Sequence, residues 1–177
     1  LTIIQQQAFS ITDLENGELL SKYNIISANA YLGADSIVRA LEAGAQIIVT
    51  GRVADPSLFL APMIHEFGWK MDDYDILGKG TVIGHLLECA GQVTGGYFAD
   101  GLMKKVENLD KLGHPFADVF ADGSAIIGKV DDTGGVVNLQ TAKEQLLYEV
   151  MNPHEYFTPD VIADFTTVQL KETGKDQ

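Results

Sequence analysis

Cysteine, long apolar runs and basic side chains are all scarce in this sequence, and each scarcity excludes a class of protein. Cys89 is the single cysteine among 177 residues, so no intrachain disulfide can form. No segment approaches the roughly 18 uninterrupted apolar residues of a membrane-spanning helix, and residues 1–7 lack the basic and apolar regions of a signal peptide. We therefore expect a cytoplasmic protein without a membrane partner. Because the chain does not begin with methionine, we also expect processing or a fragment.

Basic residues are also few in this sequence. The chain has 12 lysines and arginines against 25 aspartates and glutamates, which gives a formal net charge of −13. Nucleic acids and acidic membrane surfaces would be repelled by that field. The charges are interspersed along the chain, so their simplest role is solubility. With 46% hydrophobic and 21% charged residues, the sequence has the composition of a folded domain rather than that of a disordered or membrane protein.

The familiar local signatures of catalysis and cofactor binding are also missing. The sequence contains no Gly-x-Ser-x-Gly elbow, no phosphate-loop lysine motif, no spaced glycines of a dinucleotide site, and no zinc-finger, calcium-loop or kinase pattern. Serine-hydrolase chemistry and nucleotide binding therefore receive little support. We assign no metal, and the cofactor stays unknown.

The first half of the chain has the pattern of an α/β protein with a mostly parallel sheet. Residues 23–28 and 46–50 are short apolar runs of the kind found in buried strands, and residues 34–43 between them have helical periodicity. Strand, helix and strand in that order form a βαβ unit with parallel strands. Two further helices are expected to pack on the sheet, one from Pro56 to about Phe67 and one from about Tyr74 to Gly91.

The second half mixes other elements. Residues 116–120 and 124–130 flank Asp122-Gly123, which predicts a hairpin. Residues 141–144 resemble a capping box and predict a helix over 142–150, and residues 161–170 are expected to form a strand. We interpret residues 1–177 as a single α/β domain, or a fragment of a longer one, with a sub-boundary conceivable near residue 100 because the pattern changes there.

One candidate ligand site is the turn after the second predicted strand. Arg52, Asp55 and Ser57 follow this strand directly, and Asn29 follows the first. Ligands of open α/β sheets bind beyond the carboxyl ends of the strands, and an arginine beside a helix start suits an anion. These four residues are therefore predicted to bind substrate. The alternative is structural, with Asp55 capping the helix and pairing with Arg52.

A second candidate site is a polar stripe on the predicted helix 74–91. His85, Glu88, Cys89 and Gln92 are spaced by three and four residues, which places them on one helical face. His85 oriented by Glu88 suits general acid–base catalysis, and Gln92 is predicted to contact substrate. The same residues could form a buried polar or interface network, or contribute two ligands to a metal site completed from elsewhere.

Several motifs, in order, are similar to the acyclic terpene utilisation (AtuA-like) family. They are residues 27–33 (SANAYLG), 48–57 (IVTGRVADPS), 84–96 (GHLLECAGQVTGG), 122–125 (DGSA), 133–135 (TGG) and 143–149 (KEQLLYE). The resemblance implies a cytoplasmic protein associated with the catabolism of citronellol and geraniol through coenzyme A thioesters. It supplies no established catalytic residues. Family members are longer, which implies strands before Leu1 and a portion after Gln177.

Two functional hypotheses follow. The first is an enzyme or binding domain for an acyl-type metabolite, with acyl-coenzyme A thioesters among the candidates, in which His85 and Glu88 transfer protons. The second is a non-catalytic scaffold subunit, in which the glycine-rich helix of residues 78–91 packs against another subunit. Under both hypotheses we expect a homo-oligomer.

Overall fold

The structure is a computed structural model, and it describes residues 11–13 and 16–177. The chain divides into two units, Leu1–Ala30 and Tyr31–Gln177. The described part of the first unit contains a 3-10 helix, Leu20–Lys22, and an antiparallel bridge between Thr12 and Leu19. Residue 100, where a sub-boundary was conceivable, lies within the second unit, and the single-domain organisation stays a prediction.

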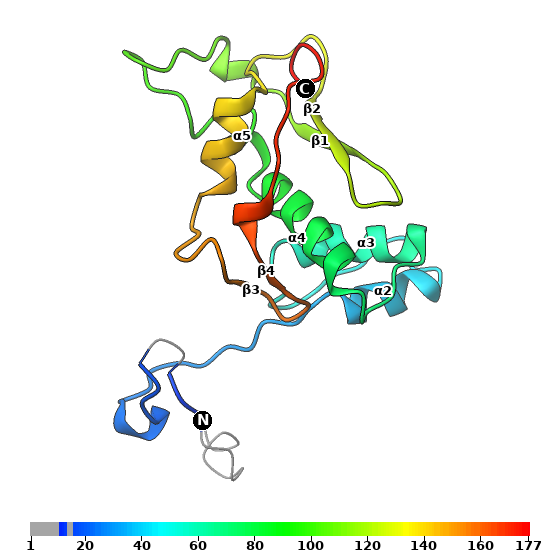
Figure 1. Cartoon of the computed structure of the whole chain (residues 1–177), viewed down its shortest axis with the longest axis vertical. Coiled ribbons are helices and arrows are strands. Elements are labelled where there is room, and N and C mark those ends of the chain that lie inside the picture. Colours follow the sequence, from blue (N-terminus) through cyan, green and yellow to red (C-terminus); the bar gives the residue numbers. More distant parts are fainter. Residues whose placement is uncertain (1–10, 14–15) are drawn as a thin grey trace. The chain divides into compact units, whose positions relative to one another are not determined.

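Helices dominate the second unit (Figure 1). Among the residues that the structure describes, no helix has both the length and the apolar character that crossing a bilayer requires. The helices are α2 (Asp35–Glu42), α3 (Ser57–Phe67), α4 (Tyr74–Glu88) and α5 (Leu139–Leu146), and the strands are β1 (Pro115–Val119), β2 (Ala125–Lys129), β3 (Tyr156–Phe157) and β4 (Ile162–Ala163). Short 3-10 helices lie at Ala90–Gln92, Leu109–Lys111 and Phe165–Thr167.

Helix α4 lies at the centre of this unit. It contacts α3, α5, β1 and β4, and in Figure 1 it runs between α5 and the β1–β2 hairpin. Its apolar residues Leu77, Ile83 and Leu87 are buried in the main core with Leu60 of α3. Leu86, on another face of α4, joins a second core with residues from α5, β4 and the last 3-10 helix. Because both cores meet on α4, this helix fixes the positions of the polar side chains on its remaining face.

The parallel sheet predicted for the first half is wrong. In the described residues the sheets are two separate antiparallel pairs, β1–β2 and β3–β4, and neither 23–28 nor 46–50 forms a strand. Ile47 and Val49 are 87% and 91% exposed, and no described backbone hydrogen bond involves residues 46–50. A β-branched run becomes a strand only when a neighbouring segment supplies hydrogen-bond partners. Among the described residues of the first half, parallel pairing is limited to an isolated bridge between Leu32 and Val53.

The helices expected in the first half are confirmed with small changes in their ends. Helix α3 begins one residue after Pro56 and ends at Gly68, which adopts a left-handed conformation (φ 64°). Helix α4 begins at Tyr74, where the Asp73 side chain accepts a hydrogen bond from the Ile76 N–H, and ends at Glu88 rather than Gly91. These boundaries follow from proline, glycine and capping residues that act locally.

In the second half the hairpin is confirmed, with Val119 paired to Ala125 across the Asp122-Gly123 turn. The predicted helix over 142–150 begins earlier, because Asn138 rather than Thr141 is the N-cap. The Asn138 side chain accepts from the N–H groups of Gln140 and Thr141, and Thr141 completes the capping box. The predicted strand over 161–170 is reduced to β4, because Asp164 accepts a hydrogen bond from the Thr166 N–H and starts a 3-10 turn instead.

Candidate functional site

The C-terminal end of α4 carries a buried imidazole–carboxylate pair. His85 and Glu88 lie three residues apart on the helix, and His85 Nδ1 is 2.9 Å from Glu88 Oε1. The side chain of His85 is 1% exposed and that of Glu88 is 10% exposed. The two residues therefore form the close pair that their spacing predicts, almost completely shielded from solvent.

Aromatic residues from the C-terminal part of the chain enclose this pair. The ring centroids of Tyr156 in β3 and Phe165 in the last 3-10 helix each lie 5.2 Å from that of His85. The other ring nitrogen of His85, Nε2, is buried and has no hydrogen-bond partner among the described residues, and the same holds for Glu88 Oε2. Buried polar atoms are almost always paired in folded proteins, so each unpaired one needs an explanation, and a catalytic role is one of these.

The surroundings of the pair favour the neutral form of Glu88. Burial raises the pKa of Glu88; the hydrogen bond from His85 opposes this, and the charges of Asp55 and Glu149 add to it. Burial also raises the pKa of Cys89 and that of Tyr156. A carboxyl group with a raised pKa next to an imidazole is suited to holding and releasing a proton. In the described part of the chain, no group of three or more His, Cys, Asp or Glu side chains is arranged to hold a metal ion.

Two glutamines connect the pair to α5. Gln145 Nε2 donates to the backbone carbonyl of His85 at 3.1 Å, and Gln92 Nε2 donates to Gln145 Oε1 at 3.3 Å. Gln145 is 1% exposed and was not singled out from the sequence. The sequence signal that could have found it is its spacing of four residues from Thr141, which places both on one face of α5. Gln92, a predicted substrate-binding residue, thus lies in the same network as His85.

The predicted site before α3 is arranged differently. The exposed Arg52 donates to the Tyr31 hydroxyl at 3.0 Å, and its guanidinium lies 5.7 Å from the centre of that ring. Asp55 is exposed and does not cap α3, whose N-cap is Pro56, so the capping prediction is wrong. Asp55 still acts on the first site, because its charge raises the pKa of Glu88.

Ser57 and Asn29 take no visible part in this arrangement. Ser57 is buried, and its hydroxyl donates to Asp160 Oδ2 at 2.5 Å, so its described contact is structural. Asn29 is exposed and belongs to the first unit, so its substrate-binding role stays a prediction.

The glycines of α4 and the following turn contact their own chain. A Cβ added at Gly84 would lie 2.6 Å from the carbonyl oxygen of Pro56, and one added at Gly80 would lie 2.5 Å from Leu60 Cδ1. A Cβ at Gly91 would meet Leu112. These glycines therefore allow α3 and the later loop to approach α4 within the chain.

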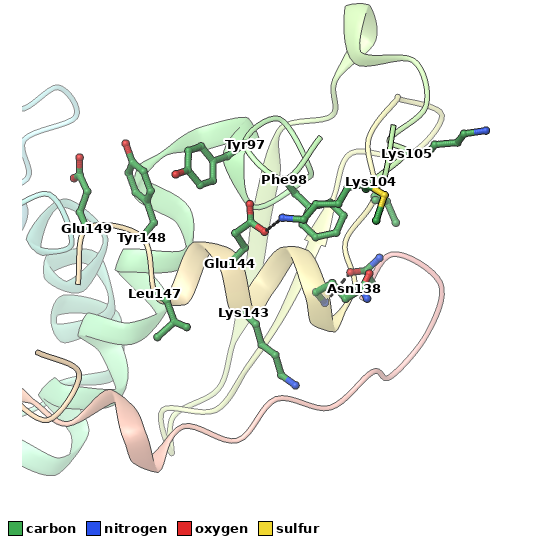
Figure 2. Close-up of a pocket in the computed structure, with 13 residues that line it drawn as sticks. Tyr97, Phe98, Lys104, Lys105, Asn138, Lys143, Glu144, Leu147, Tyr148 and Glu149 are labelled. Carbon is green, nitrogen blue, oxygen red and sulfur yellow. Dashed lines mark hydrogen bonds and ion pairs between the residues drawn. The ribbon is translucent and has the colours of Figure 1, made fainter. Parts of the chain in front are cut away.

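A cavity of about 830 Å³ lies beside α5 (Figure 2). The residues that line it include Tyr97, Phe98, Lys104, Glu144, Tyr148 and Glu149. His85 and Glu88 do not line this cavity, but its Tyr148–Glu149 end is near them. Glu149 acts electrostatically on Glu88, and Cys89 on Tyr148, so this end lies within electrostatic range of the buried pair.

Comparison with known proteins identifies the family. The family model described as "Acyclic terpene utilisation family protein AtuA" matches residues 2–177. The chain belongs to the AtuA family. This confirms the resemblance read from the sequence motifs. No curated protein and no solved structure matches the chain. Membership of the AtuA family points to acyclic terpene utilisation and leaves the reaction open.

Proposed function

We propose that this chain binds an acyl-type small molecule in acyclic terpene utilisation or related catabolism, and that Glu88, oriented by His85, transfers a proton to or from it. The observation that carries the proposal is the buried His85–Glu88 pair, with its 2.9 Å contact and one unpartnered polar atom on each side chain. Membership of the AtuA family supplies the metabolic context.

The proton-transfer chemistry depends on the atom of Glu88 that has no hydrogen-bond partner, Oε2. Glu88 Oε1 is engaged by His85 Nδ1, so Oε2 is the carboxylate atom left to accept a proton. The carbon next to a thioester carbonyl is the acidic position of an acyl group, and a carboxylate with a raised pKa is a stronger base toward it. Removing that proton protonates Glu88 and leaves an enolate, and the reverse step returns the proton.

His85 is a positioning residue in this scheme. Its imidazole holds the Glu88 carboxyl group in one orientation, and the rings of Tyr156 and Phe165 hold the imidazole. Gln92 and Gln145 fix the end of α4 on which both residues lie. Water is largely excluded at this depth, which strengthens each electrostatic contact.

The scaffold alternative receives less support from the contacts of α4. In that alternative the subunit interface lies on the glycine-rich face of α4. The space beside Gly80, Gly84 and Gly91, however, is filled by other residues of the same chain. His85 is also buried within the chain rather than presented to a partner.

Exchange of the α-proton is the direct test. Short branched acyl-coenzyme A thioesters and their free acids would be incubated in D₂O with the protein, and deuterium uptake followed by NMR. Glu88→Gln keeps the size and the hydrogen bond and should reduce exchange by roughly 10²- to 10⁴-fold. His85→Asn keeps a donor near the Nδ1 position and should reduce exchange less.

The matched control is His65→Asn, a change at an exposed histidine on α3. It should leave exchange unchanged. Full exchange activity in a folded Glu88→Gln protein would contradict the proposal, as would exchange that depends equally on His65.

A further inference from the structure

The cavity beside α5 contrasts in charge with the rest of the chain. Lys104, Lys105 and Lys143 line it together with Glu144 and Glu149, three positive against two negative side chains, in a protein whose net charge is −13. A local excess of positive charge in an acidic protein attracts anions to that place and repels them elsewhere. At about 830 Å³ the cavity lies within the usual range for small-molecule sites, roughly 300–1,000 Å³.

The centre of the cavity is a lysine held between an acid and a ring. Lys104 Nζ is 2.5 Å from Glu144 Oε2 and 4.5 Å from the centre of the Phe98 ring, as Figure 2 shows. The Lys104 side chain is 42% exposed, so its contact with Glu144 is only partly shielded from solvent. Lys105 and Lys143 point away from this contact in Figure 2, which leaves Lys104 as the central cation.

Apolar groups border the lysine on one side. Tyr97 and Tyr148 meet edge to face with centroids 4.7 Å apart, and Leu147, which also lines the cavity, is 60% exposed. Exposed aromatic and aliphatic groups next to a partly exposed cation match a ligand with an apolar body and one negative end.

The nearby helix start offers no separate phosphate site. The N–H groups of Gln140 and Thr141 at the beginning of α5 already donate to the Asn138 side chain. A phosphate at this place would therefore lack the free backbone N–H donors of a helix start, and the lysines would be its donors.

We infer that this cavity binds a carboxylate with an apolar hydrocarbon chain, its carboxylate on Lys104 and its chain against Tyr97, Leu147 and Tyr148. Binding of such an acid does not depend on the proton-transfer proposal. Its significance as a substrate or product site rests on the proposed function, because the Tyr148–Glu149 end of the cavity is near Glu88.

Titration calorimetry at fixed ionic strength tests this inference with hexanoate, octanoate and decanoate as probes. Acetate carries the charge without the chain, 1-octanol the chain without the charge, and inorganic phosphate a different anion. At least one of the three longer carboxylates should bind at least tenfold more tightly than acetate, 1-octanol or phosphate. Equal or stronger binding of phosphate, or no binding of the three acids, would overturn the inference.

Two variants of the ion pair give opposite expectations. Lys104→Met should weaken binding about tenfold or more, because the charged hydrogen bond is lost. Glu144→Gln should strengthen binding roughly two- to fivefold, because Lys104 is released from its competing carboxylate. If the ion pair were only structural, Lys104→Met and Glu144→Gln would change the affinity for the carboxylate in the same direction. Affinities that both rise or both fall would therefore refute the assignment.

Lys70→Met is the matched control, since Lys70 is exposed and is not among the residues that line the cavity. It should leave affinity unchanged, and a loss equal to that of Lys104→Met would show a non-specific charge effect and reject the site.

Glu88→Gln separates the two proposals. Retained octanoate binding with lost α-proton exchange supports both, whereas retained binding with retained exchange leaves the cavity standing and rejects the proton-transfer role.

Discussion

Removing the Ser57 hydroxyl should destabilise the second unit measurably. Asp160, which precedes β4, accepts hydrogen bonds from Ser57 Oγ at 2.5 Å and from the Ala34 N–H at 2.8 Å. It thereby joins the starts of α2 and α3 to the C-terminal hairpin. The space is tight, because a Cβ at Gly33 would collide with the Asp160 carboxylate. We call this arrangement of Ala34, Ser57 and Asp160 the carboxylate clamp.

The magnitude follows from the type of bond. A hydrogen bond to a charged group contributes about 1.5–3 kcal/mol to stability. Asp160 is only half-buried, so water can reach the carboxylate in the variant, and Ser57→Ala should cost about 1.5–2 kcal/mol of unfolding free energy. For a chain of this length, each kcal/mol lowers Tm by about 2–4 °C, which gives a decrease of about 3–8 °C.

Urea denaturation followed by circular dichroism measures this change. Ser36→Ala, an exposed serine in α2, is the control and should stay within about 0.5 kcal/mol of the unmodified protein. Asp160→Ala should cost more than Ser57→Ala, since the Ala34 N–H also loses its acceptor. In the Asp160→Ala background the further change Ser57→Ala should cost little. Equal free energies for Ser57→Ala and the control would refute the clamp.

Four other substitutions have expected outcomes. Gly84→Ala should destabilise the protein by about 1–3 kcal/mol, because its Cβ would meet the backbone of Pro56 at the start of α3. Gly78→Ala should stabilise the protein by about 0.5–1 kcal/mol, because an added Cβ would have nothing within 4 Å. Urea denaturation measures both changes. Because the pKa of Glu88 is raised in the folded state, the folded protein holds the Glu88 proton more tightly than the unfolded chain does. The contribution of protonated Glu88 to stability is present below pH 4.5 and is lost as pH rises from there through the folded pKa. Glu88→Gln should therefore gain stability relative to the unmodified protein as pH rises over that range, and a difference that is independent of pH would contradict it. Val49→Thr should change the unfolding free energy by less than about 0.5 kcal/mol because the side chain is 91% exposed, and a cost above 1 kcal/mol would instead favour a buried strand.

What could be predicted from the sequence was the information that acts over a few residues. The helix over 34–43, the helix after Pro56 and the Asp122-Gly123 hairpin all depend on periodicity, capping or turn residues within one segment, and the structure confirms them. The parallel sheet depended on which segments pair. Residues 46–50 have the composition of a buried strand, but composition does not specify a partner, and none is described here.

The candidate site shows the same division. His85 and Glu88 could be paired from their spacing of three residues. Gln145 and Tyr156 lie 60 and more residues further along the chain and carry no motif, so only the packing of α5 and β3 on α4 brings them to His85. The role of Ser57 was predicted differently for the same reason, because Asp160 is 103 residues away in the sequence.

The carboxylate clamp also bears on the synthesis of the protein. Its two hydrogen bonds connect residues separated by 126 and 103 positions. A ribosome that adds about 5–20 residues per second needs roughly 5–25 seconds to proceed from Ala34 or Ser57 to Asp160. During that interval the starts of α2 and α3 lack their acceptor, so the nascent helices cannot reach their final stability. Folding of this unit therefore cannot be complete before Asp160 has been synthesised, and chains truncated before Asp160 should be exposed to chaperones and proteases.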